Sequence, residues 1–251
     1  MCTLSWMSGR GFRRILVNRD ENRERPPESP PVLHAPEGMP RFVAPVDPES
    51  GGTWVAANEY GLACAVLNHY AAGGDTEPPG AATASRRSRG ELPVALMGFR
   101  RAGEAEEWIR SAPDLADFRP FILALFGEPE TGFLARWDGR HLGIRDLEGE
   151  GPPVSTSSRR PREVIAERER LFREMTGPRP GLEELLAFHG HHDPAYPETG
   201  PAMIRPDAST RSLCVVRIDA TDIAMRHQPF DAEAAVFLAP SAIKLPRRIV
   251  S

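Results

Sequence analysis

Apolar runs that come in pairs around short polar turns are the feature of this chain that most limits its fold. The first pair begins at residue 2 and is separated by Ser8-Gly9-Arg10-Gly11, a turn sequence typical of a β-hairpin. A later pair flanks Asp138-Gly139-Arg140, and Asp-Gly is a strong tight-turn signal. The pattern predicts strands at 2–7, 12–18, 53–58, 62–70, 133–137, 141–147, 213–218 and 223–227.

Helical patterns separate these strand pairs. Residues 161–175 form a charged amphipathic pattern, and 182–189 form a shorter one. The chain order is four strands, helices, two strands, helices and two strands, with no strand-helix-strand alternation. This order predicts an α+β fold with antiparallel sheets covered by helices, in a single domain over residues 1–251. The other predicted helices are 91–100, 103–111 and 117–126, and 19–52 and 71–90 are predicted loops, the second of them mobile.

Composition excludes several classes of partner. Hydrophobic residues make up 40% of the chain and charged residues 26%, as in ordinary soluble proteins. A net charge of −4 gives no reason to expect nucleic acid or an anionic membrane surface as a partner. No run reaches the ~18 apolar residues of a membrane span. Cys64 and Cys214 lie in apolar runs and are expected to be buried and reduced, which with the lack of a signal-peptide pattern predicts a cytoplasmic protein.

Met1-Cys2 is the most suggestive dipeptide for chemistry. A small residue after the initiator permits removal of Met1, which leaves Cys2 with both a thiol and an α-amine. The reference pKa of an α-amine is about 7.7–8.0 and that of a thiol about 8.5, so a proton can pass between them near neutral pH. Such a residue carries a nucleophile and its own general base. Taken alone, the dipeptide also fits an ordinary chain start.

Three polar segments can be brought to such a nucleophile. The first hairpin returns the chain beside Cys2 and ends in Asn18-Arg19-Asp20-Glu21-Asn22. An arginine beside a thiol lowers its pKa, and a carboxylate can fix an α-ammonium group. Asn68 ends an apolar strand and is a suitable oxyanion donor. Arg211, at the entrance of the strand at 213–218, can orient a carboxylate or an amide. Each segment in isolation also fits a solvated strand end or loop.

Together these segments resemble the NRDE family, which includes the transport and Golgi organisation proteins. The resemblance rests on Cys2, Asn18-Arg19-Asp20-Glu21, Gly51-Gly52-Thr53-Trp54, Asn58-Glu59-Tyr60-Gly61-Leu62, Leu67-Asn68 and Thr210-Arg211-Ser212. The same elements are similar to the wider cysteine N-terminal-nucleophile hydrolases, including bile-salt hydrolases and penicillin V acylases. That resemblance implies a four-layer αββα sandwich and cleavage of linear amide C–N bonds.

The resemblance also implies roles for individual residues. Cys2 would be nucleophile and base, Arg19 would lie beside the thiolate, and Asp20 would hold the α-amine, a place that Glu21 or Asn22 can also fill. Asn68 would donate to the oxyanion, and Arg211 matches a late active-site arginine. The hydrolases carry a second Asn where this chain has Val154-Ser155-Thr156-Ser157-Ser158, so a Thr156 or Ser157 hydroxyl would have to replace it. The expected substrate-contacting residues are Glu21, Asn22, Trp54, His69 and Thr156.

These observations predict a hydrolase for a linear amide or thioester of a small acyl compound, working without a cofactor. The alternative is a non-catalytic protein on the same fold that binds and traffics lipid, acyl-CoA or haem, with Cys2 and His69 as possible haem ligands. A structural or interaction domain is a third reading. His189-Gly190-His191-His192-Asp193 is interpreted as a solvated helix end, and no metal site is expected.

Overall fold

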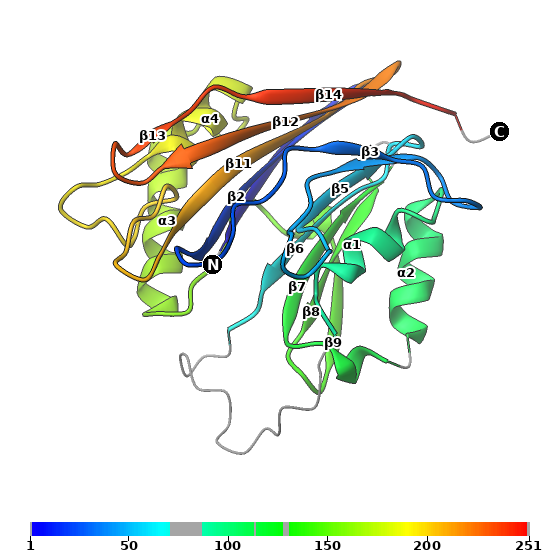
Figure 1. Ribbon diagram of the computed structural model, residues 1–251, viewed down its shortest axis with the longest axis horizontal. Helices are drawn as coiled ribbons and strands as arrows, with labels where there is room; N and C mark the ends of the chain where they lie inside the picture. Colours follow the sequence, from blue (N-terminus) through cyan, green and yellow to red (C-terminus); the bar gives the residue numbers. More distant parts are fainter. Residues whose placement is uncertain (1, 71–86, 113, 128–130, 250–251) are drawn as a thin grey trace.

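Two antiparallel sheets stack face to face in the computed structural model, which describes residues 2–70, 87–112, 114–127 and 131–249 (Figure 1). The first sheet has the strand order β10-β1-β2-β11-β12-β13, and β14 also pairs with β12. Its strands are β1 (Cys2–Gly9), β2 (Phe12–Asn22), β10 (Val154–Thr156), β11 (Ala208–Ile218), β12 (Asp222–Asp231), β13 (Val236–Phe237) and β14 (Ser241–Pro246).

The second sheet follows chain order from one edge to the other. Each described strand pairs antiparallel with the next, from β3 to β9. This meander brings the end of β6, where Asn68 lies, beside the start of β7. Its strands are β3 (Val32–His34), β4 (Phe42–Ala44), β5 (Val55–Asn58), β6 (Ala63–Asn68), β7 (Phe121–Phe126), β8 (Gly132–Trp137) and β9 (Leu142–Asp146).

Helices cover the outer face of each sheet, which gives four layers (Figure 1). α3 (Pro161–Met175) and α4 (Leu182–Gly190) lie on the first sheet, and α1 (Glu91–Leu96) and α2 (Ala102–Ser111) lie on the second. Two short 3₁₀ turns, at Leu115–Asp117 and Leu147–Gly149, complete the described elements. The predicted α+β class and αββα layering are confirmed.

Alternation along β1 and β2 sorts their side chains between two layers. Cys2, Leu4 and Val17 belong to the large apolar cluster between the sheets. Leu16 belongs to the smaller cluster beneath α3 and α4. Because successive side chains of a strand point to opposite faces, Thr3 lies on the helix side of the sheet. The hairpin that carries Cys2 therefore takes part in both cores.

The segment 117–126 was predicted to be helical, and that prediction is wrong. Phe121–Phe126 forms β7, which lies between β6 and β8 and is buried at every position. A short, continuous apolar run carries no period that distinguishes a strand from a helix when both faces are buried. The same region has only one turn of 3₁₀ helix before the strand.

Several other segments differ from the sequence prediction in extent. The predicted loop at 19–52 contains the end of β2 and all of β3 and β4, and the short strands β10, β13 and β14 were not predicted. Residues 71–86, most of the predicted mobile loop, lie outside the described residues. The helix α3 has the predicted bounds, and the four predicted hairpins are present with shifted ends.

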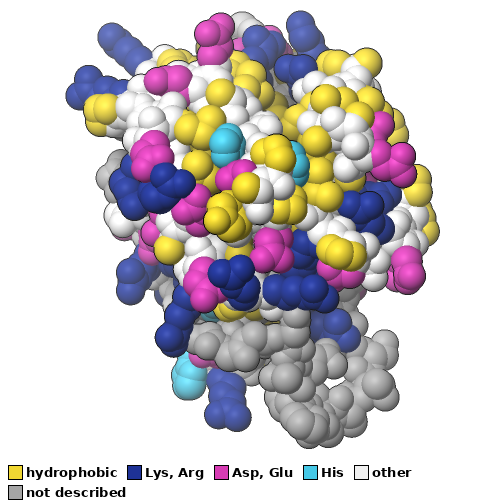
Figure 2. Space-filling model, turned by 90° about the vertical axis from the view of Figure 1, so that its left-hand side faces the viewer, with side chains coloured by type: hydrophobic (Ala, Val, Ile, Leu, Met, Phe, Trp, Pro, Cys, Tyr) yellow, Lys and Arg dark blue, Asp and Glu magenta, His cyan; other side chains and the backbone are white. Residues whose placement is uncertain are grey.

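Charged side chains of opposite sign alternate on the molecular surface. On the face shown in Figure 2, Arg and Lys groups lie next to Asp and Glu groups around apolar side chains. On the exposed side of α3, for example, Arg170 pairs with Glu167 and Glu174. None of the described helices is long and apolar enough to span a membrane.

Candidate functional site

Cys2 lies in the middle of three paired strands. In the antiparallel register it faces Thr156 of β10 on one side and Arg19 of β2 on the other. The Cys2 backbone N–H donates to Thr156 Oγ1 at 3.1 Å. The residue is 7% exposed. The hairpin turn fixes the position of Arg19, and the short strand β10 brings in Thr156 from far along the chain.

The environment of Cys2 does not favour a thiolate while Cys2 is held this way. Burial raises the pKa of the Cys2 thiol, and the carboxylate charge of Asp20 adds to this effect. The positive amino terminus, a backbone hydrogen bond from Asp20 and the charge of Arg19 act in the opposite direction but do not reverse it. Of the causes that lower this pKa, the positive amino terminus has the largest effect.

Arg19 is engaged mainly with carboxylates. Its guanidinium lies 2.7 Å from Asp47, 3.2 Å from Glu28 and 3.5 Å from Glu21. It also stacks on Trp54, with 4.8 Å between the guanidinium carbon and the ring centroid. Three acidic neighbours therefore compensate the positive charge of Arg19, the charge that the resemblance implies would lie beside the thiolate.

Glu28 is the most strongly perturbed of these carboxyl groups. Burial raises its pKa, but hydrogen bonds from His227 and Ser212 and the charge of Arg19 outweigh burial and lower it to about 2. The pKa of Asp47 is also lowered, because Arg19 and Arg25 outweigh its burial. Both carboxyl groups are therefore ionised at neutral pH beside Arg19.

Asp20 lies on the opposite, helix-facing side of β2. Its Oδ1 accepts a hydrogen bond from Thr210 Oγ1 at 2.7 Å, and its Oδ2 lies 3.6 Å from Arg168 of α3. Arg168 is fully buried, and it donates to Thr3 Oγ1 at 2.6 Å and to the carbonyls of Thr199 and Gly200. One buried guanidinium thus holds Asp20 and the residue that follows Cys2.

A second buried network, centred on His189, holds the same strand pair. Ser5 Oγ lies 2.7 Å from His189 Nε2, and His189 Nδ1 lies 3.0 Å from Asn18 Oδ1. Because the Asn18 amide nitrogen donates to two carbonyls, its oxygen is the acceptor, so His189 carries its proton on Nδ1. Burial and the charge of Arg168 lower the pKa of His189 to about 3. The prediction that His189 belongs to a solvated helix end is wrong, since it packs beneath the sheet.

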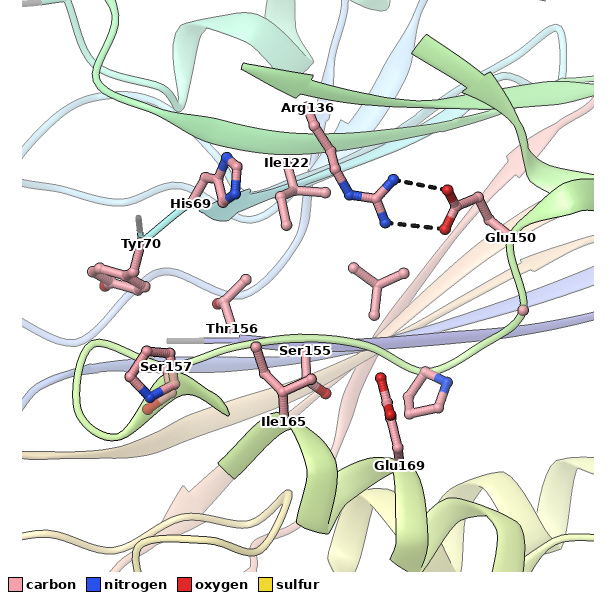
Figure 3. Close-up of a pocket in the computed structure, with 14 residues that line it drawn as sticks. His69, Tyr70, Ile122, Arg136, Glu150, Ser155, Thr156, Ser157, Ile165 and Glu169 are labelled. Atoms are coloured by element: carbon pink, nitrogen blue, oxygen red, sulfur yellow. Dashed lines mark hydrogen bonds and ion pairs between the residues drawn. The ribbon is translucent and has the colours of Figure 1, made fainter. Parts of the chain in front are cut away.

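A cavity of about 300 Å³ opens beside Thr156, between the two sheets and α3. Figure 3 shows His69, Ile122 and Arg136 on the side of the second sheet and Ser155 and Thr156 on the other side, with Ile165 and Glu169 of α3 below. Arg136 and Glu150 form a two-point ion pair at 2.8 and 3.0 Å across its wall.

The residues at the end of β6 lie at this cavity. His69 lines it, and its Nδ1 lies 3.1 Å from the Trp137 carbonyl oxygen. Asn68 Nδ2 donates to Tyr70 Oη at 2.9 Å, and Tyr70 is itself a lining residue. The amide that was expected to bind an oxyanion therefore contacts a residue that lines the cavity, with a hydroxyl as its present acceptor.

The other expected site residues lie further from Cys2 in the sheet. Glu21 is half-buried and pairs with Arg25 as well as Arg19. Asn22 is exposed, and its Oδ1 accepts from the Glu24 N–H. Arg211 is the extra residue of a β-bulge between Thr210 and Ser212, and it donates to the Arg23 carbonyl at 3.3 Å. Within the described residues, no group of three or more His, Cys, Asp or Glu side chains could hold a metal ion.

Sequence reasoning missed Arg168, which joins Asp20 to β1. Its signal is present, because Arg168 falls between Val164 and Phe172 on the apolar face of α3, where a charged residue needs a buried partner. Glu28 and Asp47 lie in a polar, proline-rich segment without a pattern that would single them out.

Comparisons with known proteins agree with this architecture. The family model described as "Transport and Golgi organisation 2" matches residues 1–131. No curated protein matches the chain. Penicillin V acylase from Agrobacterium tumefaciens superposes with a TM-score of 0.54 at 12% identity, over 98% of this chain and 86% of that chain.

Two further solved structures show the same fold. The C2A mutant of conjugated bile acid hydrolase from Clostridium perfringens has a TM-score of 0.53 at 11% identity, over 97% of this chain and 92% of that one. The N-acylethanolamine-hydrolyzing acid amidase ortholog of Caenorhabditis elegans has a TM-score of 0.52 at 9% identity, over 86% of this chain and 92% of that one. The likeness shows that the chain has the N-terminal-nucleophile hydrolase fold.

Proposed function

The chain belongs to the Transport and Golgi organisation 2 family, and from this premise we propose that it hydrolyses a linear amide or thioester of a small acyl compound with Cys2 as nucleophile. The observation that carries the proposal is that Cys2 pairs in register with Thr156, a residue that lines a cavity between the sheets. Cavities that bind small molecules are concave and carry a few convergent polar groups, as this one does.

The proposed mechanism begins with removal of Met1, which frees the α-amine of Cys2. The amine takes the thiol proton, and the thiolate attacks the acyl carbonyl carbon. The Asn68 amide, exchanging Tyr70 for the new acceptor, and the Thr156 hydroxyl donate to the oxyanion. When the C–N or C–S bond breaks, the leaving group takes the proton from the α-ammonium, and a thioester remains on Cys2.

Water completes the proposed cycle. The α-amine takes a proton from the attacking water, and the hydroxide adds to the thioester carbonyl. The C–S bond to Cys2 then breaks to release the acid, and the Cys2 thiolate takes the proton back from the α-ammonium. Asp20 and Arg168 lie on the other face of the hairpin, where they keep β1 and β2 in register. We propose that the Asp20 carboxylate also holds the α-ammonium group that Cys2 acquires when Met1 is removed.

The first test is the intact mass of the purified protein before and after a β-lactone probe. Loss of Met1 and one adduct on Cys2 are expected. Cys64 and Cys214 serve as internal controls because both are buried inside the chain and cannot carry an α-amine. A screen over N-acyl amides and acyl thioesters then compares the natural chain with Cys2→Ala, which should abolish turnover. Retention of Met1, or equal turnover by the variant, would contradict the proposal.

A second candidate is a carrier that has kept the fold without efficient chemistry. Burial raises the pKa of Cys2, the charge of Arg19 is compensated, and no asparagine is present at 154–158 to complete an oxyanion site. A carrier for lipid, acyl-CoA or haem would bind such a ligand saturably without turnover. Titrations with an acyl-CoA and with hemin distinguish this candidate, since saturable binding by a chain that turns over no substrate would favour it.

The cysteine chemistry supports a cytoplasmic location for either candidate. Cys2, Cys64 and Cys214 are all buried and unpaired as disulfides. Burial raises the pKa of Cys64 and Cys214 far above its usual range, so both stay protonated and unreactive. Reduced cysteines are typical of a reducing compartment.

A further inference from the structure

The outer edge of β1 is open over Ser5–Gly9. β2 covers one edge of β1 along its whole length, but β10 covers the other edge only at Cys2–Leu4. The chain enters β10 through Pro152–Pro153, and proline has no N–H to donate to a strand ladder. Within the described residues, no backbone hydrogen bond joins this side of Ser5–Gly9 to another segment.

The other described sheet edges carry features that block strand addition. Pro30-Pro31 precedes β3, Arg145-Asp146 ends β9, and β14 contains Lys244 and Pro246. β13 and β10, the remaining edge strands, are only two and three residues long. Proteins protect exposed edges with proline, charge or shortness. Ser5–Gly9 has neither a charge nor a proline, so this edge is distinguished from the rest.

A groove of about 930 Å³ runs beside this open edge. Trp6 lines it on the side of the inter-sheet core, where it meets Phe126 edge-to-face at 5.6 Å. Met7 lines it on the side of α3, near Phe172. Because side chains of an added strand would also alternate between these two sides, the groove offers an apolar contact to each side in turn.

Among the described residues that line the groove, the uncompensated charge is positive. Arg173 and Arg179 line it, are exposed, and make no ion pair with any described residue. Within this described lining, the only acidic side chain is that of Glu150, which already pairs with Arg136. A partner with acidic side chains is therefore complementary to the rim.

We propose that the Ser5–Gly9 edge of β1 is a docking site for an extended, acidic segment of another protein, which adds to the first sheet as a strand. Main-chain hydrogen bonds to the open edge provide the attachment, and apolar side chains at alternate positions fill the groove. A lipid could use the arginines and the apolar walls but has no groups that match a row of backbone donors and acceptors. This site is separate from the chemistry proposed for Cys2.

The test uses a fluorescein-labelled peptide of alternating valine and glutamate, followed by fluorescence anisotropy and by amide hydrogen exchange. We expect saturable binding and slower exchange of amides within Ser5–Gly9. A peptide with lysine in place of glutamate, and one with N-methylated backbone amides, should each bind at least tenfold more weakly. The double variant Arg173→Glu with Arg179→Glu should weaken binding about five- to tenfold, as expected for two exposed charge contacts.

The matched control is Arg140→Glu with Arg162→Glu, which changes two exposed arginines outside the groove and should bind the peptide unchanged. Absence of saturable binding, or binding that survives N-methylation, overturns the proposal. So does sedimentation of the peptide-free protein as a dimer whose Ser5–Gly9 amides are already protected, which would assign the edge to a second copy. Anionic vesicles that displace the peptide while leaving those amides unprotected would assign the groove to lipid.

Discussion

The two faces of the β1–β2 hairpin differ in how a buried arginine is compensated. On the inter-sheet face, Arg19 meets three carboxylates, so its charge is compensated beside Cys2. On the helix face, Arg168 meets one carboxylate, Asp20, and uses its other donors on Thr3 and two backbone carbonyls.

The two faces of the hairpin have different structural roles. The inter-sheet cluster joins the hairpin to the loop that carries Glu28 and Asp47 and keeps Arg19 in place. The helix-face network, with Arg168 and His189, fixes the backbone of the strand that carries Cys2. The position of the candidate nucleophile therefore depends most on residues that the reacting atoms do not contact.

The largest effect is expected for Arg168→Met. Loss of the guanidinium beside Asp20 breaks a buried ion pair and leaves several acceptors without a hydrogen-bond donor. The free energy of unfolding should therefore fall by about 3–5 kcal/mol. Chemical denaturation measures it. Arg170→Met, on the exposed side of the same helix, is the matched control and should cost less than about 1 kcal/mol. Equal losses in the two variants would contradict the role of Arg168 as the buried support of the helix face.

The second prediction concerns pH and His189. Its pKa is about 3 in the folded protein and about 6.5 in an unfolded chain, so between these values the unfolded state binds more protons. Stability should therefore be fully present above pH about 6.5 and fall as the pH drops toward about 3, by up to about 1.4 kcal/mol per pH unit.

Urea denaturation over this pH range checks the His189 prediction, with His189→Gln as the comparison. The variant should lose this part of the pH dependence, whatever its own stability. The loss caused by protonation of Glu28 falls lower, between pH about 4.5 and about 2, because its pKa in the folded protein is about 2. An unchanged slope in His189→Gln would exclude His189 as the source.

A smaller effect is expected for Glu28→Gln. Removing one of the carboxylates around Arg19 leaves more of its positive charge to act on the thiol, so the pKa of Cys2 should fall and its alkylation should speed up a few-fold. The pH–rate profile for iodoacetamide, with the label located by mass spectrometry, measures the change. Glu49→Gln, which removes an exposed carboxylate from the same region, should leave the profile unaltered.

The smallest effect is expected for Arg211→Ala. The side chain lies in a bulge, and its one hydrogen bond to a described residue is to the Arg23 carbonyl, so the free energy of unfolding should change by less than about 0.5 kcal/mol. Alkylation of Cys2 should also be unchanged. A rise in KM for a hydrolysed substrate, with kcat unchanged, would instead support the substrate-orienting role that the resemblance implies.

Local patterns were enough for most of the secondary structure. Turn residues define a hairpin within a few positions, and α3 could be predicted to the residue because its apolar positions repeat with the helical period. The strand β7 could not be recognised, because burial on both faces removes the alternation that identifies a strand. The short strands β3, β4 and β10 carry too few residues for any period.

The sequence by itself determined that Cys2 and Arg19 are neighbours, because a tight turn between two strands sets their register. It also determined the layered α+β class, through the order of its strands and helices. Only the tertiary structure decided that Thr156 lies opposite Cys2, that Arg168 lies beneath Asp20, and that carboxylates surround Arg19. These contacts join residues far apart in the chain, and they form only when two sheets and their helices pack, which no local pattern encodes.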